Sequence, residues 1–292
     1  MGKFLRAFIN AFLLSFGAIF LSTRIGILCH EFLGHGVGAL VVGGEVLESR
    51  IFLFHGGWVR YEGIPVGWEW LPLYAGSGVS CLIALAMVWC YRLKLSFEMA
   101  SVLLVMGTGS FFQNAIYFLR SFHYGYGDGW ELFTELGDVK NWITLGATPL
   151  LGFLAWRWTP PLLKVASHYL DHPSKVRLIV LLVVTFPLAS GSFALLGEAE
   201  LDWRDQGFQE VMRPLEKRVL DDKVKKLETE KALAGEGPIL TDEIKSLEEE
   251  VEKEHGQPPF DLLLGFALVV GCLLGVKAFP IEEKERLAVR SP

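Results

Sequence analysis

The octapeptide CHEFLGHG, residues 29–36, lies within an apolar segment that runs from Phe4 to Val42. About 20 consecutive apolar residues are enough to cross the hydrocarbon core of a bilayer. Further apolar segments cover residues 71–91, 97–119, 140–156, 178–197 and 260–279, and 51% of the 292 residues are hydrophobic. The pattern therefore predicts an all-α polytopic membrane protein with about six or seven transmembrane helices.

The segment that contains the octapeptide is too long for one upright span. At 1.5 Å per residue, a single helix from Phe4 to Val42 would measure roughly 58 Å, against a hydrocarbon core of about 30 Å. The segment must therefore tilt strongly, break, or form two spans. We expect a break at the polar stretch Ser22-Thr23-Arg24, which would leave a motif helix over residues 24–42.

The transmembrane core is expected to cover residues 1–197 and to include one β-hairpin beside the membrane. Residues 45–63 carry aromatic and β-branched side chains around the pair Gly56-Gly57. This pattern is typical of two antiparallel strands joined by a short turn. We therefore predict a membrane-adjacent hairpin directly after the motif helix.

Residues 198–258 form an acidic segment, with 18 Asp/Glu against 10 Lys/Arg. Apolar residues recur at helical spacing on both sides of the sequence GEGP, residues 235–238, which predicts an extramembrane α-hairpin. The hairpin is either a charged, solvated spacer or a surface that binds a substrate or partner. A last transmembrane helix and a basic tail follow in residues 259–292.

The distribution of basic residues predicts how the spans are oriented. If residues 4–42 cross once, then the N-terminus, loops 92–96 and 157–177 and the C-terminus share one side and carry about 12 Lys/Arg. This places both termini in the cytoplasm, and the hairpin and acidic segment outside, in a multi-pass protein of the cell membrane. Nucleic acid is not an expected partner, because its binding would need a basic patch.

His30, Glu31 and His35 are ionisable groups inside an apolar segment, where a charged side chain costs about 2.5–3.5 kcal/mol. Such residues are candidates for function, although a polar trio satisfied by neighbouring helices would explain them without a metal. The zinc-protease signature His-Glu-x-x-His has histidines four residues apart, whereas these two are five apart. The octapeptide therefore suggests a metal site and departs from the usual spacing.

The spacing of five requires a local change in the helix. On an ideal α-helix, side chains four residues apart lie within about 40° of each other, whereas a step of five leaves them about 140° apart. A π-bulge adds one residue to a turn and removes the discrepancy. Gly34 precedes His35 and, without a side chain, tolerates unusual backbone angles. The sequence thus favours a metal site on a bulged helix.

The region around the octapeptide resembles the site-2 protease family of intramembrane zinc metalloproteases, over roughly residues 24–135. The shared order is a motif helix, a hairpin, a span opening with AGSGVS (75–80), and a span with QNAIYFL (113–119) followed by GDG (127–129). The chain departs from the family in the spacing of five, which is similar to the His-Glu-Leu-Leu-Gly-His motif of the soluble dipeptidyl peptidase III family. It also lacks the proline and asparagine usual in the family's Gly motif, and the proline before Asp-Gly.

The resemblance implies a Zn²⁺ site with His30, His35 and Asp128 as ligands and Glu31 as general base. Three protein ligands would leave a coordination position for water, as in other catalytic zinc sites. The resemblance also implies that Asn114 holds substrate or supports the site. The family usually places its metal towards the cytosol, whereas the charge distribution puts the Asp128 loop outside.

The third metal ligand and the role of Asn114 have alternative interpretations. Glu131, His123 and His55 are alternative third ligands, and Asp128, between two glycines, is also suited to a plain turn. Asn114 could instead serve only as an interhelical hydrogen bond.

The expected function is that of an intramembrane zinc metalloprotease. It would hydrolyse peptide bonds in or near the transmembrane segments of membrane-protein substrates, so its partners would be such a substrate and the lipid bilayer. Two alternatives remain: a proteolytically inactive membrane scaffold with the same fold, and an ion transporter that uses the same polar residues for ion passage.

Overall fold

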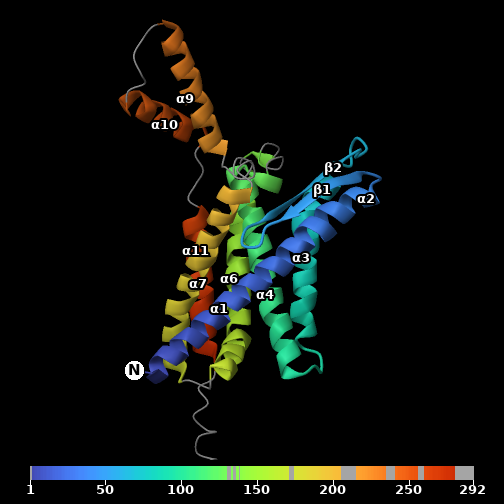
Figure 1. Ribbon diagram of the computed structural model, residues 1–292, viewed down its shortest axis with the longest axis vertical. Coiled ribbons are helices and arrows are strands. Elements are labelled where there is room, and N and C mark those ends of the chain that lie inside the picture. Colours follow the sequence, from blue (N-terminus) through green and yellow to red (C-terminus); the bar gives the residue numbers. More distant parts are fainter. Residues whose placement is uncertain are drawn as a thin grey trace, which may run out of the picture.

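A computed structural model describes residues 2–129, 133, 136, 137, 139–170, 174–204, 215–234, 241–255 and 260–279. Long helices form a bundle, and a two-stranded sheet lies at one end of it (Figure 1). The elements described below are α1 (Gly2–Leu28), η1 (Cys29–Gly36), α2 (Val37–Val41), β1 (Glu45–Ile51), β2 (Gly57–Glu62), α3 (Trp70–Cys90), α4 (Phe97–Tyr124), η2 (Gly127–Gly129), α6 (Val139–Tyr169), α7 (Lys175–Arg204), α9 (Leu215–Ala234), α10 (Thr241–His255) and α11 (Phe260–Ala278).

Among the described residues, five helices are long and apolar enough to cross a membrane, rather than the six or seven expected. These helices cover Phe4–Val41, Trp70–Cys90, Phe97–Tyr124, Lys175–Leu201 and Phe260–Ala278. The predicted span at 140–156 is helical and lies within α6, but that helix is not one of the five. Lys140 and Arg157 bound its apolar stretch and lower its mean hydropathy. The fold is compatible with a helical membrane protein.

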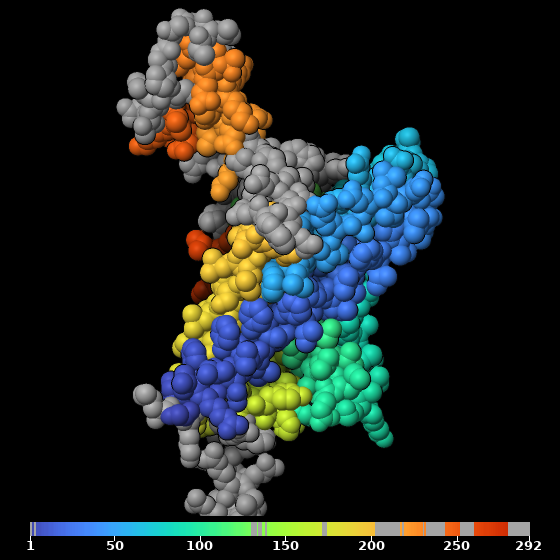
Figure 2. Space-filling view, in the orientation of Figure 1, coloured from blue at the N-terminus to red at the C-terminus, as the bar shows by residue number. Residues whose placement is uncertain are grey.

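The first helical segment is continuous from Phe4 to Val41, so the expected break at Ser22-Thr23-Arg24 is wrong. It crosses the bundle diagonally, as the blue ribbon and the blue surface in Figures 1 and 2 show. The polar residues do not end the helix because each finds a partner within it or beside it. Ser22 Oγ donates to the Val105 carbonyl at 3.1 Å, and Thr23 Oγ1 donates to the Ile19 carbonyl at 2.5 Å.

Small residues let α3 cross close to η1. A Cβ atom placed on Gly34 would lie 2.3 Å from the Gly76 Cα atom, far inside the normal contact distance. Gly34 therefore serves close helix packing, whereas the sequence suggested a role in unusual backbone angles. Small residues at such crossings are common in membrane helices, where close backbone approach increases van der Waals contact.

The predicted hairpin is present, with β1 and β2 antiparallel and Ile51 paired with Gly57. The second glycine of the Gly-Gly pair thus begins β2 and is not part of the turn. Residues 52–56, which we call the hairpin tip, are held by side chains from two helices. Arg24 on α1 donates to the carbonyls of Phe52 and His55, and Glu200 on α7 accepts from the backbone N–H of Leu53.

The two ends of the bundle carry different parts of the chain. The start of α1 and the α3–α4 connection lie at one end, and the hairpin, α9 and α10 lie at the other (Figure 1). This separation agrees with the sides assigned from the basic residues. Helix α7 continues through Arg204, past the expected boundary at residue 197.

The acidic segment contains two helices, as predicted. Helix α9 packs against α10, and the pairs Lys223–Glu250 and Lys231–Glu243 link them at 2.6 and 2.5 Å. The expected break at 235–238 and the basic tail at 280–292 lie outside the described residues.

Candidate metal centre

The π-helical segment η1 brings the two histidines of the octapeptide together. In a π-helix the backbone bonds join residues five apart, so a step of five makes about one turn. His30 Nε2 and His35 Nε2 lie 3.1 Å apart, and the ring centroids are 4.7 Å apart. The predicted widening of the helix is therefore confirmed, and it extends over the whole octapeptide.

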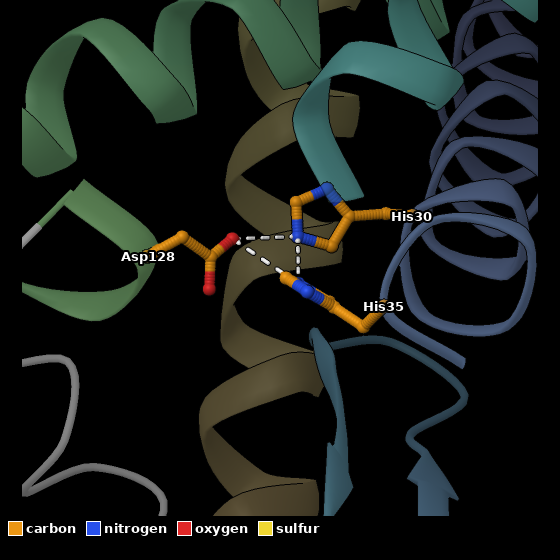
Figure 3. A group of neighbouring side chains, drawn as sticks. All are labelled: His30, His35 and Asp128. Carbon is orange, nitrogen blue, oxygen red and sulfur yellow. Dashed lines mark hydrogen bonds and ion pairs between the residues drawn. The ribbon is translucent and has the colours of Figure 1, made fainter. Parts of the chain in front are cut away.

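Asp128 reaches the histidines from the other side of the site, on the short 3₁₀ turn η2 (Figure 3). Helix α4 ends at Tyr124 and is capped by Gly125, whose φ of 67° needs the freedom of glycine, and Gly127 has a φ of 51°. This turn points the carboxylate back at η1. Asp128 Oδ2 lies 2.8 Å from His30 Nε2 and 3.3 Å from His35 Nε2.

Hydrogen bonds at the far nitrogens orient both imidazoles. His35 Nδ1 donates to the Pro72 carbonyl at 2.7 Å. His30 Nδ1 donates to Asn114 Oδ1 at 3.0 Å, and the Asn114 amide is itself oriented because its Nδ2 donates to the Ser110 carbonyl at 2.8 Å. When Nδ1 carries the hydrogen, Nε2 of a neutral imidazole holds a lone pair, so both lone pairs face the centre.

Three electron-pair donors thus converge on one point, and such an arrangement needs a positive charge between them. A proton can bridge one imidazole to Asp128, whereas a metal cation would satisfy all three atoms together. Burial alone would raise the pKa of Asp128, but without a metal the hydrogen bonds that His30 and His35 donate when they carry a proton on Nε2 outweigh burial and lower this pKa below its ordinary value. The carboxylate is therefore ionised at neutral pH and suited to bind a cation.

The donor set fits a small divalent metal. Four ligands at about 2.0–2.1 Å around a tetrahedral ion lie about 3.3 Å from one another, close to the separations of 2.8–3.3 Å seen here. Space for the histidines depends on Gly76 of α3. A Cβ atom there would lie 2.5 Å from His35 Nε2 and 2.9 Å from His30 Nε2. His30, His35 and Asp128 can thus hold a metal ion.

The centre lies in the wall of a cavity of about 450 Å³, which is lined by side chains from η1, α4, α7 and the hairpin. Glu31 is 7% exposed, lines the same cavity, and is not one of the three converging ligands. A Cβ atom on Gly57 would lie 3.1 Å from Glu31 Cγ, so the start of β2 packs directly on this side chain. A buried carboxyl group therefore stands beside the metal-binding atoms without occupying their centre.

The rival third ligands are not part of the three-residue group. His55 lies in the hairpin tip and lines the cavity, and His123 packs against Tyr124 and Phe260 at ring distances of 4.8 and 5.1 Å. Glu131 lies outside the described residues. Asn114 lines the cavity and bonds His30, so it supports a candidate ligand, and a direct contact with substrate stays a prediction.

Sequence reasoning missed Tyr117, whose ring edge packs on His30 with centroids 5.6 Å apart. Tyr117 follows Asn114 by three residues and therefore lies on the same face of α4. This spacing could have indicated from the sequence that Tyr117 faces the site. The Pro72 carbonyl was also missed, and backbone groups of this kind leave no trace in residue type. Comparison of the chain with protein-family models, curated proteins and solved structures found no match.

Proposed function

We propose that this protein is an intramembrane zinc metalloprotease that hydrolyses peptide bonds in or near transmembrane segments of other membrane proteins. The observation that carries the proposal is the convergence of His30 Nε2, His35 Nε2 and Asp128 Oδ2 at a cavity that also contains Glu31. A metal needed only for structure would be closed off by a fourth ligand, whereas three ligands beside an open cavity suit a catalytic ion.

The choice of zinc rests on ligand chemistry. Two imidazoles and one carboxylate form a common donor set of catalytic zinc sites. When bound, zinc would lower the pKa of a water molecule at the open position and would polarise a carbonyl group.

The protein's own residues would supply the remaining functions. Glu31 would accept the proton that the attacking water releases and would pass it to the departing amine. Asn114 and Pro72 would keep the two imidazoles oriented through their Nδ1 hydrogens. The cavity wall, which includes Phe54, Trp58 and Phe193, is largely apolar, so it suits the side chains of a transmembrane substrate.

The first test is the zinc content of protein purified in detergent, compared with that of His35→Ala and Asp128→Ala variants. We expect about one zinc per chain in the wild type, the capacity of a single three-ligand site, and loss of zinc from both variants. His168→Ala is the matched control, because His168 packs near Phe97, and this variant should keep its zinc. Metal-free wild-type protein, after preparation with zinc in every buffer, would refute the proposal.

A second test separates a protease from an inactive scaffold. Glu31→Gln should keep its zinc and lose cleavage of a fluorogenic Leu-rich transmembrane peptide, because the amide cannot accept the proton. If the wild type holds zinc but does not cleave this peptide in liposomes, the scaffold is the better interpretation. Ion flux without cleavage in the same liposomes would indicate the transporter.

A further inference from the structure

We infer that Tyr117 is a catalytic residue whose hydroxyl group donates a hydrogen bond to the carbonyl oxygen of the scissile peptide bond as negative charge develops on it. The inference rests on the proposed function and adds a role that the zinc ligands and Glu31 do not fill. Hydrolysis by water places a negative charge on that oxygen in the transition state, and preorganised donors aimed at it are a large source of rate enhancement.

The position of Tyr117 is defined by contacts with two of the candidate ligands. Its ring packs edge-on against His30, with centroids 5.6 Å apart and planes 80° apart. Its hydroxyl oxygen accepts the backbone N–H of Asp128 at 3.3 Å. The phenol is thus held between η1 and η2, the two segments that carry the metal-binding atoms.

The hydroxyl group keeps its own hydrogen available. A phenol oxygen can accept one hydrogen bond and still donate another. Within the described residues, the Tyr117 hydroxyl makes only the bond from Asp128 N–H, and Tyr117 lines the cavity together with Glu31 and Asn114. A substrate carbonyl bound next to the metal would therefore meet an unused donor.

Three other polar side chains of the cavity are less suited to this role. Glu31 in its ionised form is an acceptor only, and Asn114 already uses Oδ1 towards His30 and Nδ2 towards the Ser110 carbonyl. Gln113 also carries an amide group that can donate, but its side-chain oxygen lies beside Gly26 of α1, where a Cβ atom would be 3.2 Å away, and not beside a ligand-bearing segment. Among these candidates, Tyr117 alone combines a free donor with contact to the ligand-bearing segments.

The test compares Tyr117→Phe with Tyr126→Phe. Tyr126 is a neighbouring buried tyrosine, with ring centroids 6.2 Å from those of Tyr117, and it does not line the cavity. For each protein we would measure zinc per chain, kcat and KM for the Leu-rich peptide, and Kd for a Leu-Leu phosphinic peptide, whose charged tetrahedral group imitates the transition state.

Tyr117→Phe should keep its zinc and a KM within about twofold of wild type, while kcat falls by about 100- to 1,000-fold, the usual effect of losing one such donor. Affinity for the phosphinic peptide should fall by a similar factor, and Tyr126→Phe should match the wild type in every measurement. An unchanged kcat and Kd would overturn the catalytic role, and so would loss of zinc, which would assign Tyr117 a structural one.

Failure of the proposed function would look different. Wild-type protein that lacks zinc or does not cleave the peptide would overturn the proposed function, and this inference with it. Wild-type protein that holds zinc and cleaves, beside an equally active Tyr117→Phe, would overturn this inference alone.

Discussion

The candidate metal centre and the hairpin tip border the same cavity but are held in different ways. At the centre, the side chains of His30 and His35 are fixed by a side-chain amide and a backbone carbonyl. At the tip, backbone groups are fixed by charged side chains, because Arg24 donates to two carbonyls and Glu200 accepts two N–H groups at 2.7 and 2.6 Å. The comparison shows two solutions to one requirement, that every polar group in an apolar setting must have a partner.

The two regions should therefore respond differently to substitution. Around the metal centre, backbones approach closely and one added carbon atom has no space, so changes should act on metal binding. At the tip, the Phe54 ring lies 5.9 Å from both Phe20 and Phe193, and the polar contacts involve backbone groups outside η1 and η2, so changes should loosen the tip and leave metal binding intact.

The largest effect is expected from Gly76→Ala. The new carbon would lie 2.5 Å from His35 Nε2, so the histidine or α3 must move, and overpacking of this kind costs about 1–3 kcal/mol. We expect zinc binding to be lost, as measured by zinc per chain after dialysis against free zinc. Gly78→Ala on the same helix is the control, because a Cβ there meets nothing within 4 Å. A normal zinc content in both variants would contradict the described crossing.

A smaller effect on the same region is expected from Asn114→Ala. Loss of the partner at His30 Nδ1 should weaken zinc binding by about 10- to 100-fold, the usual range for such supporting bonds. Asn114→Asp keeps an acceptor at this position and should restore most of the affinity, as measured by competition with a chelator. Equal affinities for Asn114→Ala and the wild type would show that this bond does not orient His30.

At the tip, Arg24→Ala and Glu200→Gln should leave the zinc content unchanged. Each removes a charged partner of part-buried backbone groups, so each should lower the free energy of opening the tip by about 1–3 kcal/mol. Hydrogen exchange of the Leu53 and Phe54 amides measures this opening. The matched control is Glu48→Gln on β1, where the pair with Arg50 is exposed at 3.7 Å and should contribute little.

A double variant sharpens the same test. If Arg24 and Glu200 act on one tip, the double variant should lose less than the sum of the single losses. Loss of zinc from either single variant would mean that the tip and the metal centre are one cooperative unit, and the comparison would fail.

The smallest effect should come from pH, acting through His55. Burial, together with the nearby charge of Arg24, lowers the pKa of His55 in the folded protein below its ordinary value of 6.5, although Glu198 and Glu200 act in the opposite direction. The open tip then binds the proton more tightly than the closed tip. Closure is therefore most stable above pH 6.5 and should weaken as the pH falls below it.

Exchange of the Leu53 amide, corrected for its intrinsic pH dependence, measures this weakening. His55→Gln removes the titrating group and should give a flat profile. A profile that is the same in both proteins would assign the pH response to another group.

Sequence reasoning succeeded where the signal was local. The five-residue spacing of His30 and His35 within an apolar segment predicted the widened helix, and the Gly-Gly pair predicted the hairpin. It failed where distant residues decide the outcome. The polar residue Arg24 was expected to break a helix, yet its guanidinium group donates hydrogen bonds to two carbonyls of the tip. Nothing in the sequence near residue 24 indicates these partners. The Glu200 contact, 146 and 147 residues away from its partners, was likewise invisible.

The candidate site divides in the same way. His30, Glu31 and His35 follow from one short motif, and the position of Asp128 beside the histidines agrees with the expectation from the family resemblance. Pro72 acts through its backbone carbonyl, and Gly76 acts through the absence of a side chain, so their residue types alone do not indicate these roles. Their roles depend on the crossing of α3 with η1, which is a property of the assembled bundle.

The widened turn η1 also sets the angular phase between the two halves of a long helix. Ala11 is fully buried, and Ser15 lies 3.4 Å from Thr185 of α7, whereas Gly38 beyond η1 packs on α3. A widened turn with one extra residue turns through about the same angle as an ordinary turn without it, so the segments on either side keep the faces they would have with a histidine spacing of four. The same feature therefore joins the two histidines and keeps α1 on α7 and α2 on α3, and a deletion that removed the extra residue but kept the wide turn would misalign both.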